Sequence, residues 1–263
     1  MNILKKMIFF IAALFVIICL YVFLQIPSEK KIKGCIKTTM FEIDLCPKNA
    51  NYTLLKNISN HLQRAIILTE DSSFYSHNGF DSEGIERCLE KLKEKGRIVC
   101  GGSTISQQLS KNLFLSKNKN FIRKGIEALI TVKLEKTLSK KEILEKYLNV
   151  VQFGKNIFGV KQAANFYFKK TPAQLDPLES AFLAMVLPNP EKYSQSYFRK
   201  DLTKFAKRRI SQILNNMYKY KSLSEEQYVT ATARLESFLQ SGQSQKTTND
   251  DLTEEDLNEM LDE

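Results

Sequence analysis

Residues 139–148 read Ser-Lys-Lys-Glu-Ile-Leu-Glu-Lys-Tyr-Leu. This stretch begins with a capping box, because a serine and a glutamate three positions apart can each bond the other residue's backbone N–H. Such a box marks the first turn of an α-helix. The helix that it opens carries the apolar residues Ile143, Leu144, Tyr147 and Leu148.

Helical patterns extend on both sides of this stretch. Upstream, one apolar stripe on a helix near residues 122–137 is formed by Ile126, Leu129, Ile130 and Leu134. Downstream, residues 176–179 read Asp-Pro-Leu-Glu, a start signal with proline at the first helical position. Alternating strand-like segments are scarce, so we expect a mainly α-helical body with room for a short hairpin.

The composition describes a folded chain with a basic surface. Its 263 residues are 43% hydrophobic and 10% aromatic, which suits one sizeable domain or two small ones and excludes a wholly disordered chain. The net charge of +10 indicates an anionic partner, which could be nucleic acid, a lipid surface or a phosphorylated substrate.

The N-terminal region holds 18 apolar residues without a charge, from residue 7 to residue 24, and Ile26 extends the run. A helix of this length crosses a hydrocarbon core of about 30 Å. A cleaved signal peptide is the alternative, but the run is long for a signal core and no small-x-small cleavage site follows it. Lysines flank both ends, so the positive-inside rule does not fix the orientation. We expect residues 1–6 in the cytoplasm, an anchor over residues 7–26 and an exported body.

The regions beyond the anchor differ in composition. Residues 27–52 are polar and lysine-rich, and we expect a stalk with little regular structure there. Residues 53–222 form the expected folded domain. Residues 223–263 are expected to hold a C-terminal helix and an acidic disordered tail, because the last 23 residues carry eight acids and one lysine.

Four cysteines lie outside the anchor: Cys35, Cys46, Cys88 and Cys100. An even number in an exported domain permits two disulfides with three possible pairings, of which Cys35–Cys46 and Cys88–Cys100 are the sequence-local ones. Four unpaired thiols are the alternative. Because there is no Cys-x-x-Cys pair and no Cys/His cluster, we expect no zinc site.

Residues 69–81 hold the first candidate for chemistry, since the adjacent acids Glu70 and Asp71 directly follow an apolar helix. A carboxylate at the end of an apolar segment is partly desolvated, and desolvation raises its pKa toward the range of a general base. His77 and Asp81 could hold the following turn by hydrogen bonds. A solvated acidic pair and a structural histidine are the alternatives.

Residues 101–112 are the second candidate and read Gly-Gly-Ser-Thr-Ile-Ser-Gln-Gln-Leu-Ser-Lys-Asn. Paired glycines let backbone N–H groups approach an anion, and the seven hydroxyl and amide side chains that follow suit sugar hydroxyls and phosphate oxygens. The stretch lacks the Gly-Lys-Ser/Thr ending of a nucleotide-binding Walker loop. A flexible loop before a polar helix face is the alternative.

Residues 105–146 are the third candidate, a basic stretch with ten bases and four acids. Lys111, Arg123 and Lys124 are among the bases closest to the polar loop and could neutralise a diphosphate leaving group. Interleaved apolar residues such as Phe121 suit a surface that dips into a lipid interface. A solvated helix face is the alternative.

Together these segments resemble the peptidoglycan glycosyltransferase family, glycosyltransferase family 51, whose domain also occurs in bifunctional penicillin-binding proteins. The family's first motif, Glu-Asp-x-x-Phe-x-x-His-x-Gly, is matched at every fixed position by residues 70–79, and the second by residues 101–112. The third, Arg-Lys-x-x-Glu, is matched by residues 123–127 and the fourth by residues 143–149. Further matches reach residues 187–190.

The likeness covers roughly residues 60–195. No Ser-x-x-Lys with a later Lys-Thr-Gly follows it, so we expect no transpeptidase domain, and the chain resembles the monofunctional members. The resemblance implies a mainly α, lysozyme-like glycosyltransferase domain over residues 53–222, attached to an N-terminal transmembrane helix.

The resemblance also implies roles for the matched residues. Glu70 would be the general base that takes a proton from the acceptor's 4-hydroxyl, and Glu127 a second carboxylate that assists the diphosphate side or orients a metal. The implied substrate-binding residues are Asp71, His77, Ser103, Thr104, Gln107, Gln108, Lys111, Asn112, Arg123 and Lys124. A neutral alcohol needs a base and a departing diphosphate needs cations, so this division of roles is chemically sound.

The implied reaction polymerises lipid II, which is undecaprenyl-diphosphate-linked GlcNAc-MurNAc-pentapeptide, by inverting transfer with release of undecaprenyl diphosphate. No cofactor is required, although a divalent cation such as Mg²⁺ could share the diphosphate charge without a dedicated ligand cage. Expected partners are lipid II, the nascent glycan strand, membrane lipid and other cell-wall synthesis or division proteins, but no nucleic acid. We expect a single-pass protein of the bacterial inner membrane with its catalytic domain on the periplasmic side.

Two other functions are alternatives. A lysozyme-like enzyme that cleaves glycan would also use a glutamate in a helical cleft, but a neutral glycan needs no cation cluster. A non-enzymatic, membrane-tethered binder of an anionic polymer would rely on basic charge alone. The binder predicts that Glu70→Gln leaves function intact.

Overall fold

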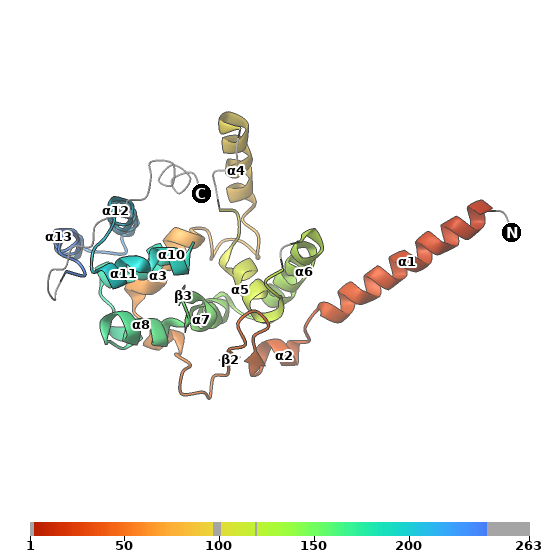
Figure 1. The fold of residues 1–263 in the computed structure, drawn as a ribbon, viewed down its shortest axis with the longest axis horizontal. Helices are drawn as coiled ribbons and strands as arrows, with labels where there is room; N and C mark the ends of the chain where they lie inside the picture. Colours follow the sequence, from red (N-terminus) through yellow and green to blue (C-terminus); the bar gives the residue numbers. More distant parts are fainter. Residues whose placement is uncertain (1–2, 97–100, 119, 241–263) are drawn as a thin grey trace.

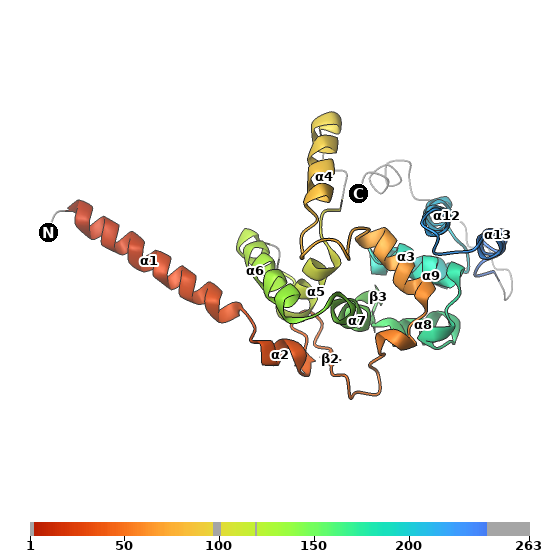
Figure 2. The ribbon, with the colours of Figure 1, turned by 180° about the vertical axis from the view of Figure 1, so that it is seen from behind.

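The computed structural model describes residues 3–96, 101–118 and 120–240. Within these ranges the chain is mainly α-helical, as predicted, and its strands form two short antiparallel hairpins. In chain order the elements are α1 (Ile3–Gln25), α2 (Glu29–Lys33), β1 (Ile36–Lys37), β2 (Asp44–Leu45), η1 (Leu55–Asn57), α3 (Asn60–Glu70), α4 (Ser82–Lys95), α5 (Ile105–Phe114), α6 (Phe121–Thr137), α7 (Lys140–Val150), β3 (Gln152–Gly154), β4 (Ile157–Phe158), α8 (Val160–Phe168), η2 (Pro172–Gln174), α9 (Pro177–Val186), α10 (Pro190–Tyr193), α11 (Gln195–Arg199), α12 (Lys204–Lys219) and α13 (Glu225–Ala233). Two of these helices, α1 and α4, project from a body of packed helices (Figure 1, Figure 2).

Capping boxes begin α7 and α9, as the sequence predicts. Ser139 and Glu142 cap α7 reciprocally, and Asp176 and Glu179 do the same for α9. Each box supplies partners for backbone N–H groups that a first helical turn otherwise leaves unpaired. The helix predicted near residues 122–137 is α6.

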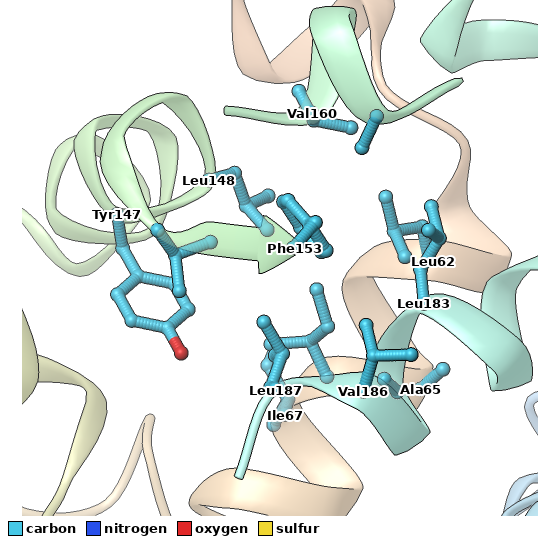
Figure 3. Close-up of a cluster of buried hydrophobic side chains, with 14 of the residues drawn as sticks. Leu62, Ala65, Ile67, Tyr147, Leu148, Phe153, Val160, Leu183, Val186 and Leu187 are labelled. Atoms are coloured by element: carbon cyan, nitrogen blue, oxygen red, sulfur yellow. The ribbon is translucent and has the colours of Figure 1, made fainter. Parts of the chain in front are cut away.

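The centre of the core is α9, which packs against α3 and α12. Every residue from Leu178 to Val186 is buried, so this helix is surrounded on all sides. In Figure 3, Leu62 of α3 and Leu183 of α9 lie close to Phe153 in one apolar cluster. A second group of helices is formed where α5 packs against α6 and α7. The candidate site lies where the end of α3 meets α5.

Residues 27–52 are more ordered than the predicted stalk. They contain α2 and the β1–β2 hairpin, in which Ile36 pairs with Leu45. Ile32, Ile36 and Leu45 are at most 4% exposed, because the few apolar side chains of this polar segment join the core of the body. The backbone N–H of Thr39 also bonds a carbonyl of α5. The expectation of little regular structure is therefore corrected.

Cys35 and Cys46 form a disulfide that closes the β1–β2 hairpin. This is the sequence-local pairing of the first two cysteines. Cys100 lies outside the described residues, so the pairing of Cys88 with Cys100 stays a prediction.

The helix predicted to be the anchor, α1, carries many exposed apolar side chains. Phe9, Phe10, Phe23 and Leu24 are each at least 70% exposed, and α1 runs away from the body in both views (Figure 1, Figure 2). Among the helices that the structure describes, none combines the length and the apolar character needed to cross a membrane.

At its C-terminal end the described chain packs α13 against α12. The rings of Tyr218 and Tyr228 stack with their centroids 4.8 Å apart. The predicted acidic tail falls on residues 241–263, which lie outside the described residues. The domain boundaries at residues 52 and 222 stay predictions.

Candidate active site

Glu70 is the last residue of α3, and the packing of that helix fixes its position. Leu62, Ala65 and Ile66 are fully buried, so α3 cannot rotate or slide without disrupting the core. The next residue, Asp71, caps the C-terminus of the helix and has a non-helical backbone. A carboxylate is thereby held at the end of an apolar helix, as the sequence predicts.

The environment of the Glu70 carboxyl makes it a stronger base than an ordinary glutamate. The residue is half-buried, and burial raises the pKa of its carboxyl above the usual value. Gln108, whose amide Nε2 donates a hydrogen bond of 2.8 Å to the carboxylate, opposes this rise, as do the charges of Arg209 and Lys111. Burial prevails, and a raised pKa is what a general base needs to work near neutral pH.

Gln108 lies between Glu70 and Tyr147. Its Oε1 accepts a hydrogen bond of 3.0 Å from the Tyr147 hydroxyl, while its Nε2 donates to Glu70. Tyr147 is fully buried on α7, and this burial raises its pKa well above the usual value. Sequence reasoning counts Tyr147 among the apolar residues of its helix and misses this contact. A hydroxyl on an apolar stripe is the one sequence feature that points to it.

Asp71 and His77 hold the loop that follows α3. Asp71 accepts hydrogen bonds of 2.9 Å from His77 Nε2 and 2.9 Å from the backbone N–H of Ile105. His77 Nδ1 accepts the N–H of Gly79 at 3.0 Å, which assigns the neutral tautomer with its proton on Nε2. The Asp71 and His77 side chains are 1% and 9% exposed and hold this loop, and Asp71 also lines a cavity beside Glu70, so the substrate-binding role of both stays a prediction.

Two more of the predicted binding residues cap the N-terminus of α5. Thr104 and Gln107 form its capping box, and Thr104 Oγ1 also donates to the carbonyl of Gly79 at 2.7 Å. Together with Asn112, they are at most 7% exposed. Thr104 and Gln107 supply the hydrogen bonds that start the helix, Thr104 also lines a cavity beside Glu70, and Asn112 is buried within the helix, so the substrate-binding role of the three stays a prediction.

A cavity of about 230 Å³ opens beside Glu70. Its walls are the end of α3, the start of α4 and residues 101–104. The exposed Ser103 lies on this wall, and its hydroxyl is 3.4 Å from Lys124 Nζ. A polar cavity beside a carboxylate of raised pKa fits a substrate rich in hydroxyl groups.

The predicted cations of α6 are held by one buried carboxylate, Glu127. Arg123 Nη1 lies 3.2 Å from one of its oxygens and Lys124 Nζ 2.6 Å from the other. The Glu127 side chain is 3% exposed, whereas that of Lys124 is half-exposed. Glu127 therefore fixes the positions of two cations, of which Lys124 reaches the surface.

Lys111 interacts electrostatically with both of these cations and with Glu70. Burial lowers the pKa of its ammonium group, and the carboxylates of Glu127 and Glu70 oppose that change. Arg123 and Lys124 lower the pKa of Lys111 as like charges. Because Lys111 and Glu70 each shift the other's pKa, the base and the cation cluster of Lys111, Arg123 and Lys124 form one electrostatic site.

A metal ligand set is not formed by the predicted residues. In the part of the chain that the structure describes, no three His, Cys, Asp or Glu side chains are grouped to hold a metal. Glu127, the carboxylate expected to orient one, already pairs each of its oxygens with a cation. A divalent cation carried mainly by the substrate diphosphate needs no such cluster and stays a prediction.

A second pocket, of about 290 Å³, lies between the end of α3 and α12. Arg209, Gln212 and Asn216 line it together with Thr69. The charge of Arg209 lowers the pKa of Glu70, and the pocket is lined by Thr69, the residue directly before Glu70. Sequence reasoning misses Arg209, because nothing in the intervening chain shows that α12 returns to α3.

Comparison with known proteins agrees with this geometry. A family model described as Transglycosylase matches residues 37–218. The biosynthetic peptidoglycan transglycosylase of Aromatoleum aromaticum is 56% identical over 140 residues, which cover 53% of this chain and 61% of that protein. The protein of the same name from Azoarcus sp. (strain BH72) is 54% identical over 142 residues, with 54% and 62% covered.

A third relative of that name, from Acinetobacter baumannii, is 45% identical over 160 residues, which cover 61% of this chain and 71% of the relative. The chain spans about three fifths of the length of the first two relatives. The matched family region contains Glu70 and the whole cation cluster.

Proposed function

Because this chain belongs to the transglycosylase family, we propose that it is a glycosyltransferase that polymerises lipid II into peptidoglycan glycan strands. One observation carries the proposal: the half-buried Glu70 carboxylate, with its raised pKa, shares an electrostatic site with the cation cluster. Glycosyl transfer from a lipid diphosphate to a sugar alcohol needs a base and a set of cations together. The relatives named biosynthetic peptidoglycan transglycosylase support the same polymer.

In the proposed reaction, Glu70 takes the proton from the 4-hydroxyl of the acceptor's terminal GlcNAc. That oxygen forms a bond to C1 of the donor MurNAc, and the bond from C1 to the diphosphate oxygen breaks. The diphosphate leaves with the electron pair, and attack from the opposite face inverts the anomeric centre. The products are a longer strand, undecaprenyl diphosphate and a proton that Glu70 passes to solvent.

The cation cluster stabilises the leaving group in this scheme. Negative charge grows on the diphosphate as the C1–O bond breaks, and fixed positive charges are most effective when they need not reorganise. Glu127 holds Arg123 and Lys124 in place before the substrate arrives. A strong acid is unnecessary, because a diphosphate leaves as an anion.

We also propose that residues 7–26 anchor the protein in the inner membrane by a single span, with the body on the periplasmic side. The uncharged apolar run and the exposed apolar side chains of α1 support this placement. The Cys35–Cys46 disulfide suits an oxidising compartment outside the cytoplasm. Phe121 and Ile122, which begin α6 and are 97% and 67% exposed, would meet the lipid surface beside the cations.

Incubation of the purified full-length protein with labelled lipid II tests the proposed activity. We expect strands that lengthen with time, release of undecaprenyl diphosphate, and no change in strands added at the start. Shortening of the added strands would instead identify a glycan-cleaving enzyme. A protein that binds an anionic polymer but changes neither the labelled lipid II nor the added strands would be a non-enzymatic binder.

A further inference from the structure

We propose that Tyr147 is a positioning residue for Glu70, and that it acts through the side-chain amide of Gln108. The inference rests on the proposed function, because it concerns how the general base is kept ionised. It adds to the site a residue that touches no substrate and lies on a different helix from the base.

The first step concerns the Tyr147 hydroxyl. The Tyr147 side chain is fully buried and lies at one side of the apolar cluster (Figure 3). A buried hydroxyl without a partner is costly, so the position of its partner is strongly constrained. That partner is Gln108 Oε1, at 3.0 Å.

The second step concerns the two ends of the Gln108 amide. An amide has one acceptor end and one donor end, and the two cannot exchange without a flip of the whole group. The Tyr147 hydroxyl donates to Oε1, which leaves Nε2 facing Glu70 at 2.8 Å. The flipped amide would set Oε1 against the Glu70 carboxylate, where two acceptors repel. Tyr147 therefore supports, from the Oε1 end, the orientation in which Gln108 donates to the base, an orientation that the Ser103 carbonyl, 3.4 Å from Nε2, supports from the other end.

The third step concerns the ionisation of Glu70. A hydrogen bond to a carboxylate stabilises its charged form, so the Gln108 bond opposes the rise in pKa that burial causes. The other charged or titratable groups that act on Glu70 are Arg209 of α12, Lys111 of α5 and Asp71 of the adjoining loop. Without the Tyr147 hydroxyl, Gln108 loses the bond that holds its Oε1 end, its hydrogen bond to Glu70 weakens, and the fraction of deprotonated Glu70 falls at mildly acidic pH.

The test is the pH dependence of polymerisation by Tyr147→Phe in the full-length protein. This substitution keeps the ring and removes only the hydroxyl. We expect the acid limb of kcat/KM to move to higher pH, with a loss of roughly 2- to 10-fold on that limb, the size of one hydrogen bond. At pH values well above this acid limb, kcat/KM of the variant should equal that of the wild type. A merely structural defect would lower the rate at every pH.

The matched control is Tyr167→Phe. Tyr167 is also buried, and its hydroxyl donates to the carbonyl of Phe153 at 2.7 Å in the core, away from the proposed machinery. In the Tyr167→Phe variant, the acid limb of kcat/KM should lie at the same pH as in the wild type. Gln108→Met should shift the limb in the same direction as Tyr147→Phe, and combining the two substitutions should add nothing further.

A second readout does not depend on activity. Carbon-13 NMR of the side-chain carboxyls, with the Glu70 signal identified by its absence in Glu70→Gln, reports the titration of the base directly. A higher Glu70 pKa in Tyr147→Phe supports the inference, and an unchanged titration overturns it. A wild-type protein that makes no polymer contradicts the proposed function, yet the carboxyl titration still decides the role of Tyr147.

Discussion

The carboxylate of Asp71 accepts a hydrogen bond of 2.9 Å from the backbone N–H of Ile105, which lies 34 positions further along the chain. Asp71 directly follows Glu70, and Ile105 is the first residue of α5. This single bond therefore joins the end of the helix that carries the base to the start of the helix that carries Gln108 and a cation. The relative position of base and cations depends on it.

Asp71→Ala should destabilise the protein substantially. The substitution removes the acceptor of the Ile105 N–H and the partner of His77, both of which are buried. We expect a loss of about 2–4 kcal/mol in the free energy of unfolding, measured by chemical denaturation. Asp81→Ala is the matched control, because it removes an N-cap of the projecting helix α4 and should cost about 1 kcal/mol. Equal losses in the two variants would argue against a special role for Asp71.

The charge of Lys111 should set the alkaline limb of activity. Burial lowers its pKa, so the charged form is lost at a lower pH than for an ordinary lysine, and turnover should fall as the pH rises through that lowered value. Lys111→Arg keeps its charge at every accessible pH and should move the limb upward. Lys111→Met should lower turnover roughly 100- to 1000-fold. Lys136→Met, on the exposed last turn of α6, is the control and should leave turnover within about 2-fold.

The disulfide between Cys35 and Cys46 should stabilise the segment that leads from α1 to the body. It closes a loop of 11 positions, for which chain entropy predicts about 3 kcal/mol. The double variant Cys35→Ser/Cys46→Ser should lose about that much in the free energy of unfolding. Protein reduced with dithiothreitol should lose at least as much stability as the double variant, because the reductant would also open the predicted Cys88–Cys100 bond. A stability that neither change lowers would contradict the expectation.

Glu70→Gln should raise thermal stability at neutral pH. In the folded protein the pKa of Glu70 is raised above its usual value of 4.5, so the folded state binds more protons than the unfolded chain between those two pKa values. Stability due to this group is therefore present at low pH and is lost as the pH rises through that window. The Tm difference between variant and wild type should be near zero below the lower pKa and should grow with pH. A difference that grows as the pH falls would contradict the raised pKa.

The sequence predicts most of the helical fold, and its short motifs contain the proposed base and cations, whose roles stay predictions. Capping boxes such as Ser139 with Glu142 are local, so they can be recognised without tertiary structure. Glu70 follows its apolar helix directly, and Lys111, Arg123 and Lys124 lie within one basic stretch. Patterns that span a few residues were sufficient for these predictions.

The sequence does not show which polar motif residues form structural hydrogen bonds, because these bonds join residues that are far apart in the chain. Asp71, His77, Thr104 and Gln107 are polar residues in the right motifs, but their hydrogen bonds hold the loop and start a helix, and only the fold shows this. The segment of residues 27–52 is polar on average, yet its few apolar side chains are buried. The average polarity of the segment does not reveal that these few apolar side chains are buried.

The most direct test of the central claim is the rate at which Glu70→Gln polymerises lipid II, compared with the wild type under the same conditions. The substitution keeps the size of the side chain and removes the base. We predict a loss of at least about 100-fold, the lower range for general-base catalysis, in a variant whose circular dichroism matches that of the wild type. Polymerisation within about 2-fold of the wild-type rate would contradict the assignment of Glu70 as the base.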